Sequence, residues 1–139
     1  MIRVDFHILA SDDAEARLRH ACKVAEKAYR AGYRIVVQTD AQTAKIFDDL
    51  LWSHSDSSFV PHAQEPESPQ DWPVVIYAGQ SRDGERDYLI NLADEFPHLD
   101  MQYKVIAEII DEQSAAAGRD RYRRYRDAGA SLNVHNINS

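Results

Sequence analysis

Apolar and polar positions along the chain follow two periods, one typical of strands and one typical of helices. Alternate residues are apolar from Ile2 to Ile8, which indicates a strand with two unlike faces. The continuous apolar run Ile35-Val36-Val37 is typical of a strand covered on both faces. This run belongs to a predicted strand over 33–38, and three further strands are predicted over 73–78, 88–92 and 103–110. The segment 103–110 is open to a short helix as well, and its β-branched content favours a strand.

Helical spacing appears between these strands. Ser11 is the expected N-cap of a first helix that ends at Gly32, and Thr39 is the expected N-cap of a second that ends near Trp52. A third helix is predicted over 111–128. Strands that alternate with helices predict a parallel sheet with right-handed crossovers. We therefore expect one three-layer α/β/α domain over residues 1–139, with a mostly parallel five-stranded sheet.

Two segments lack a regular pattern. The stretch 53–71 is long for a loop inside a compact domain, and such loops are often functional. Phe59 and Val60 are apolar residues in this polar stretch, and the sequence leaves open whether they pack onto the core or face a partner. The tail from Ser131 to Ile137 is polar with spaced apolar residues and is expected to lie back on the body.

Composition narrows the function classes. The chain has 139 residues and a formal net charge of −7, so the body as a whole should repel nucleic acid. Cys22 is the single cysteine and is expected to be a core residue. The sequence holds no run of 18 apolar residues, and its first residues lack the layout of a signal peptide. We expect a cytoplasmic protein with no membrane contact.

Catalytic motifs are largely missing from the sequence. The turn after the first strand has no glycine that would let the backbone approach a phosphate, which argues against nucleotide binding. Asp12 and Asp13 in this turn resemble the acidic pair of a receiver domain, but the third strand does not end in the aspartate that such a domain needs. The six histidines show no metal-ligand spacing, and no Gly-x-Ser-x-Gly elbow is present. We expect no enzyme activity, cofactor or metal. A small α/β phosphohydrolase or a degenerate nucleotide-binding domain is the alternative.

A basic segment near the end of the chain stands out against this acidic body. Five arginines and two tyrosines lie between Arg119 and Arg126. On a helix, four of these residues share one face: Arg119, Tyr122, Arg123 and Arg126. A solvated helix face is the ordinary interpretation of such a run. The exclusive use of arginine, and tyrosines interleaved rather than gathered on a core face, favour recognition of an acidic peptide with an aromatic end.

The chain resembles the family of chi subunits of bacterial DNA polymerase III holoenzyme. The resemblance spans nearly the whole chain in order, and its specific parts are Leu51-Trp52, the run Ser57 to His62, and the run Arg121 to Gly129 with Leu132-Asn133. It implies a non-enzymatic linker in DNA replication. Such a linker would join the clamp loader, through its psi subunit, to the acidic, phenylalanine-ended tail of single-stranded-DNA-binding protein.

Site residues also follow from the resemblance. Arg119 and Tyr122 match the tail-binding site, Gly129 ends the same helix, and Arg123 and Arg126 share its face. Trp52 and Phe59 match the surface that contacts psi, and Val60 and Pro61 are included with them. Two positions depart from relatives, which carry a lysine at the place of Ala115 and an aromatic residue at the place of Ala130. The apolar pocket for the tail is therefore expected to differ in shape.

Overall fold

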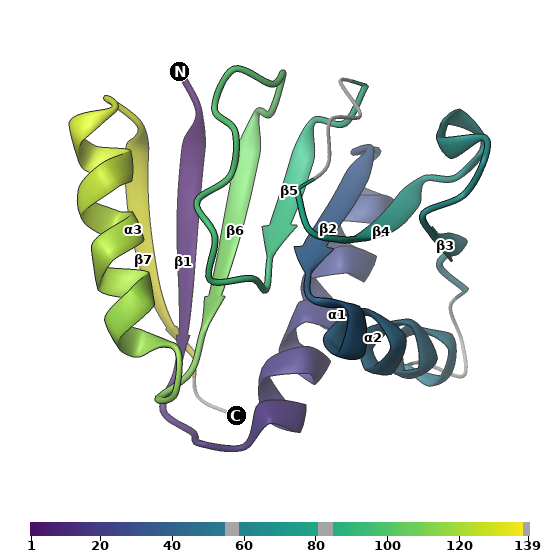
Figure 1. Ribbon diagram of the computed structural model, residues 1–139, viewed down its shortest axis with the longest axis horizontal. Coiled ribbons are helices and arrows are strands. Elements are labelled where there is room, and N and C mark those ends of the chain that lie inside the picture. The colour runs from purple at the N-terminus through teal and green to yellow at the C-terminus, as the bar shows by residue number, and fades with distance from the viewer. Residues whose placement is uncertain (55–58, 81–84, 138–139) are drawn as a thin grey trace.

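The computed structural model describes residues 1–54, 59–80 and 85–137, and its centre is one parallel sheet (Figure 1). The strand order is β3-β4-β2-β5-β6-β1-β7, and every pairing is parallel. The elements are β1 Arg3–Leu9, α1 Ala14–Arg30, β2 Ile35–Thr39, α2 Ala41–Ser53, β3 His62–Gln64, a 3-10 turn Pro69–Asp71, β4 Val74–Ala78, β5 Tyr88–Asn91, β6 Val105–Ile110, α3 Ala115–Asp127 and β7 Ser131–Ile137.

The α/β/α layering is confirmed, but the sheet has seven strands rather than the expected five. The two extra strands, β3 and β7, form its edges. β3 has three residues, too few to show a period of two. β7 pairs with β1 along seven residues, yet its side chains are mostly exposed on both faces, so its sequence lacks the usual apolar alternation. The segment 103–110 does form a strand, as its composition favours.

Apolar side chains pack on both faces of the sheet. One face packs against α1 and α2 through residues such as Leu18, Ala25 and Phe47. The other packs against α3 and the connection 92–104, which supplies Phe96 and Tyr103. Figure 1 shows α3 lying beside β7, at one edge of the sheet. No helix among the described residues is long and apolar enough to span a membrane.

Local signals determine the helix ends. The N-cap of α1 is Asp13, whose carboxylate accepts from the Glu15 amide, and the expected cap Ser11 instead accepts from the Asp13 amide. The N-cap of α2 is Asp40 rather than Thr39. Both corrections shift the cap by one or two residues to an aspartate, which caps as well as serine or threonine. Cys22 is buried, and burial raises the pKa of its thiol to about 12, so it is a core residue as predicted.

Candidate protein-binding surfaces

Helix α3 is anchored on the sheet at its first turn. Asp111 and Ser114 exchange hydrogen bonds: the Ser114 amide and hydroxyl donate to the Asp111 carboxylate, at 3.0 and 2.9 Å. Gly118 follows one turn later, where a Cβ atom would lie 2.9 Å from Cδ1 of Ile110. The missing side chain allows the helix to approach β6 closely. The hydrogen-bonded turn before α3 and this close contact therefore fix the position of the basic face.

Two members of the arginine-tyrosine run face the core. The buried Glu108 carboxylate on β6 accepts from Arg121 Nε at 3.0 Å and from the Tyr125 hydroxyl at 2.6 Å. Asn91 Nδ2 donates to the same carboxylate oxygen at 2.9 Å. Burial, and then the charge of Glu108, raise the pKa of Tyr125, so this phenol stays protonated as a donor. The expectation that the tyrosines do not gather on a core face is thus wrong for Tyr125.

The remaining arginines of α3 are exposed. Arg119, Tyr122 and Arg126 lie within about 60° of one another around the helix axis, at 100° per residue. Arg123 lies farther from the sheet and pairs with Asp120 at 2.8 Å, in an exposed contact. Arg119 makes no hydrogen bond or ion pair within the described part of the chain, so its guanidinium is free to bind an anion.

An apolar strip borders this face. The ring of the half-buried Tyr122 packs edge-on against Phe6 of β1, with centroids 5.3 Å apart. Phe6 is in register with Val134 of β7, and Val134 is 49% exposed. Leu132, two residues earlier on the same face of β7, is half-buried. Arg119 and Arg126 therefore flank a tyrosine that stands next to partly exposed aliphatic side chains. Val134 and Leu132 were not predicted as site residues, because the sequence pattern does not indicate strand β7.

Gly129 ends α3 and directs the chain into β7. Its φ is +84°, a left-handed conformation that glycine adopts without strain. The Gly129 amide donates to the Arg126 carbonyl at 3.1 Å, and the Ala130 amide donates to the Tyr125 carbonyl at 3.1 Å. These two bonds form a Schellman motif. Gly129 thus sets the turn between α3 and β7, the two elements that border the apolar strip. The half-buried Ala130 contributes to this strip.

A second exposed apolar surface lies at the other edge of the sheet, near β3. Trp52 of α2 is 52% exposed and Phe59 is 59% exposed, and their rings lie 5.1 Å apart. Trp52 also packs on His62, at 4.5 Å between ring centroids. His62 is buried, and its Nε2 lies 2.9 Å from the Asp48 carboxylate. The aromatic pair therefore rests on a fixed histidine.

The neighbouring residues of this loop behave differently. Val60 is 4% exposed and belongs to the core under α1 and α2, so the expectation that its side chain contacts a partner is corrected here. The sequence leaves open whether Phe59 and Val60 pack onto the core or face a partner. Val60 packs in the core and anchors the loop, whereas Phe59 is exposed. Pro61 is half-buried. The run 55–58 lies outside the described residues, so the resemblance at Ser57 and Ser58 has no structural counterpart here.

Within the described ranges 1–54, 59–80 and 85–137, no group of three histidine, cysteine or carboxylate side chains is arranged to hold a metal ion. His54 and His62, which the sequence leaves without local partners, pair with helix carboxylates. His54 Nε2 lies 3.4 Å from the Glu26 carboxylate, and His62 Nε2 lies 2.9 Å from that of Asp48. Asp13 caps α1 in place of the expected Ser11. These polar groups have structural roles in the fold.

Fold and surfaces together define a three-layer α/β protein that carries two exposed apolar-aromatic surfaces, one of them rimmed by arginine. A profile of the family described as DNA polymerase III chi subunit, HolC, matches residues 1–133. The chain belongs to this family. It is 37% identical to DNA polymerase III subunit chi of Pseudomonas aeruginosa over 141 residues, which cover 99% of this chain and 98% of that protein.

Two further relatives carry the same name. The subunit chi of Haemophilus influenzae is 29% identical, with 95% of each chain covered, and that of Escherichia coli is 32% identical, with 81% of this chain and 80% of that protein covered. Among solved structures, a chain of the crystal structure of T4 UvsW superposes with a TM-score of 0.65 at 12% identity. That match covers 99% of this chain and 42% of the other, and at this identity it concerns the fold alone.

Proposed function

We propose that this chi-family protein is a non-catalytic adaptor in DNA replication. It would link the clamp loader, through the psi subunit, to the acidic C-terminal tail of single-stranded-DNA-binding protein. The observation that carries the proposal is the face of α3, where exposed arginines flank Tyr122 next to the apolar strip of β7. The relatives are named as subunits of DNA polymerase III, which supports a role inside a larger assembly and a cytoplasmic location.

The chemistry of this face suits an acidic peptide with an aromatic end. A guanidinium can grip a carboxylate with two parallel hydrogen bonds. Arg119 would bind the terminal carboxylate or a tail aspartate, and Arg126 would lie one helical turn beyond Tyr122 to extend the charge. Tyr122, Val134 and Leu132 would accept the phenylalanine ring. A hydrogen bond to a charged group contributes about 1.5–3 kcal/mol, so removal of one arginine should be measurable.

The second surface is proposed as the contact for psi. Trp52 and Phe59 expose about half of their side-chain area as one stacked pair, and aromatic anchors of this kind are typical binding hot spots. Pro61 would line the same contact, and Val60 would hold the loop from beneath. The two proposed sites lie at opposite edges of the sheet, β7 and β3, as an adaptor with two simultaneous partners requires.

The tail site is tested by titrating a fluorescent acidic peptide with a C-terminal phenylalanine against Arg119→Ala. We expect roughly tenfold weaker binding or more, because one charge-assisted contact is lost. Arg19→Ala is the matched control, since Arg19 is an exposed helical arginine on α1 that pairs with Glu15. The affinity of Arg19→Ala for the peptide should stay near that of the wild type. Equal affinity of Arg119→Ala and wild type would remove this residue from the site.

The psi site is tested with Phe59→Ala and Trp52→Ala. Each variant should release psi in a co-purification experiment while keeping its affinity for the tail peptide. The expected separation arises because neither ring contacts α3. If both partners were lost together, a general loss of fold would explain the result, and the assignment of the aromatic pair to psi would fail.

A further inference from the structure

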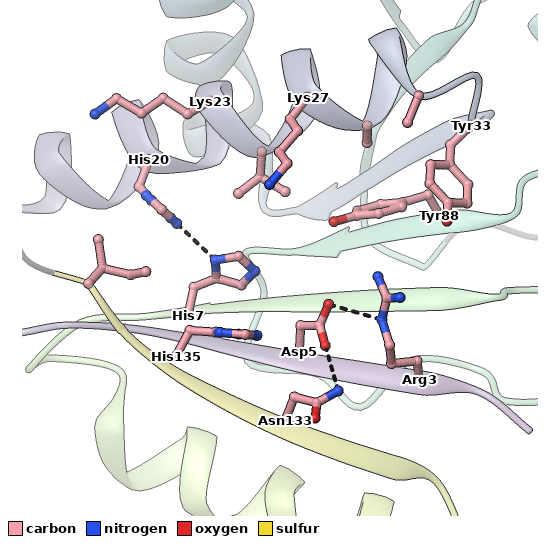
Figure 2. Close-up of a pocket in the computed structure, with 14 residues that line it drawn as sticks. Arg3, Asp5, His7, His20, Lys23, Lys27, Tyr33, Tyr88, Asn133 and His135 are labelled. Atoms are coloured by element: carbon pink, nitrogen blue, oxygen red, sulfur yellow. Dashed lines mark hydrogen bonds and ion pairs between the residues drawn. The ribbon is translucent and has the colours of Figure 1, made fainter.

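A groove of about 710 Å³ runs between α1 and the strands β1 and β7, on the face of the sheet opposite α3 (Figure 2). The odd-numbered residues of β1 and β7 face into it, because Val4 and Phe6 pack on the α3 side. Cationic and imidazole side chains dominate its walls: Arg3, Lys23, Lys27, His7, His20 and His135. This concentration of basic groups occurs in a chain whose net charge is −7.

Counter-charges do not balance these groups. Asp5 is the one carboxylate among the lining residues, and it is already engaged by Arg3 Nε at 3.2 Å and by Asn133 Nδ2 at 3.2 Å. Within the described chain, Lys23 and Lys27 form no hydrogen bond or ion pair. Figure 2 shows the ammonium group of Lys27 turned into the groove, between His7 and Tyr88. An anion entering here would find an unneutralised cation.

The histidines form a cluster on the floor of the groove. His7 Nδ1 and His20 Nε2 lie 2.9 Å apart, and the His135 ring lies 5.5 Å from His7. Burial lowers the pKa of His7 to about 4, with further lowering by His20, His135 and Lys27 and an opposing effect of Asp5. Burial and Lys23 lower the pKa of His20. Burial is the main cause of the low pKa of His7 and of His20, and the neighbouring positive charge adds to it.

Two tyrosines close the other end of the groove. The rings of Tyr33 and Tyr88 lie 5.1 Å apart. The hydroxyl of Tyr88 points toward the side where Lys27 enters (Figure 2). Burial raises the pKa of this phenol to about 12, so it remains protonated and can donate a hydrogen bond to an anion. The groove thus has a cationic, donor-rich middle and an aromatic end.

We propose that this groove binds a nucleotide, with a phosphate group between Lys27 and His7 and the base against Tyr33. Phosphate oxygens can accept separately from donors on different elements, here α1, β1 and β5. The hollow lies within the size range of small-molecule sites, roughly 300–1,000 Å³. Aromatic side chains stack on bases without sequence preference. The groove lies on the opposite face of the sheet from the proposed tail surface, which uses α3 and the even-numbered residues of β7, and apart from the proposed psi surface on α2.

Binding is coupled to a proton. A phosphate favours the state in which His7 donates from Nε2, either with Nδ1 accepting from His20 or with both nitrogens protonated. The nearby groups that oppose or assist protonation are His20, Lys23 and Lys27 on α1, Arg3 and Asp5 on β1, Asn133 and His135 on β7, and Tyr88 on β5. The bound anion adds negative charge to this set, so the pKa of His7 rises on binding.

The test uses the full chain and two probes: a thymidine mononucleotide and a short oligothymidylate. Binding is measured by calorimetry for the wild type, Lys27→Gln, His7→Gln and the control Lys45→Gln, an exposed lysine on α2. Lys27→Gln should weaken binding roughly tenfold or more, because a charged donor is lost. Imidazole resonances followed by NMR, with the phosphodiester probe, should show the pKa of His7 moving up from about 4 on saturation.

Each outcome decides the proposal. If both probes bind, and Lys27→Gln binds them more weakly, the groove is a nucleotide site. If the oligothymidylate alone binds, the groove takes the same phosphate and base from a single strand of nucleic acid. Absence of binding by either probe overturns it. Equal weakening in Lys27→Gln and Lys45→Gln, or an unmoved His7 resonance, overturns it as well. So does tighter binding of an acidic peptide than of either probe in the same groove. The NMR measurement uses the wild type, so it tests the proposal even when a variant fails to fold.

Discussion

At the scale of single residues, the buried Glu108 explains why part of the arginine-tyrosine run is not available to partners. Its carboxylate is fully buried and accepts from Arg121, Tyr125 and Asn91 through one oxygen. Its other oxygen, and Nη2 of Arg121, are buried without a partner among the described residues. Such a network orients α3 on the sheet. Removing one partner alone strongly destabilises the fold, because the remaining charge stays buried without its counter-charge.

Arg121→Met should therefore destabilise the fold by about 3–5 kcal/mol, measured by urea unfolding. The double variant Arg121→Met/Glu108→Gln should recover part of this loss, because the neutral amide still offers an oxygen to Tyr125. Arg123→Ala, which removes an exposed pair, should change stability by less than about 1 kcal/mol. Equal losses in Arg121→Met and Arg123→Ala would contradict the buried ion pair.

His7 supplies a second prediction at this scale. Its folded-state pKa is lowered from 6.5 to about 4, so between these values the unfolded state binds more protons than the folded state. Stability contributed by the neutral ring is present above about pH 6.5 and is lost as pH falls toward 4. The wild type should lose up to about 2 kcal/mol more than His7→Gln between pH 7 and pH 4.5. If the midpoint of urea unfolding changes with pH by the same amount in the wild type and in His7→Gln, the neutral His7 ring does not contribute this stability.

At the scale of elements, the turn from α3 into β7 depends on Gly129. A Cβ atom there would meet nothing within 4 Å, so the penalty of a substitution comes from its positive φ alone. Gly129→Ala should cost about 1–2 kcal/mol of stability, whereas Gly129→Asn should cost less, because asparagine tolerates left-handed backbone. Thermal unfolding of the two variants tests the order. An alanine variant as stable as the wild type would show that the turn can rearrange.

The elements also show what the sequence could and could not predict. The five inner strands, the three helices and the stop at Gly129 follow from period and glycine placement. The edge strands β3 and β7 do not, because one is short and the other is exposed on both faces. For the same reason Val134 was missed as a candidate beside Tyr122. Tyr125 was misplaced because its helical position is compatible with either face until the partner Glu108 is known.

At the scale of the whole molecule, the geometry separates the proposed surfaces. Seven strands give six spacings of about 4.8 Å, so the edges β7 and β3 lie about 29 Å apart. This exceeds the screening length of about 8 Å at physiological ionic strength. Charge on the α3 face therefore cannot act directly on a partner at Trp52 and Phe59. Outside α3 and the basic groove beside α1, the net charge of −7 disfavours the binding of acidic peptides.

The affinity of the tail peptide should consequently be the same with and without bound psi, within about twofold, since coupling between sites requires a shared element with two arrangements. Both proposed surfaces rest on one continuous parallel sheet, which we expect to act as a rigid body. Calorimetric titration of the peptide into the free protein and into its psi complex measures the difference. Raising the salt concentration should weaken peptide binding, because the arginine contacts are exposed, and should leave the aromatic psi contact less affected. A tenfold change in peptide affinity on psi binding would mean that the two edges communicate, and the independence of the two surfaces would have to be abandoned.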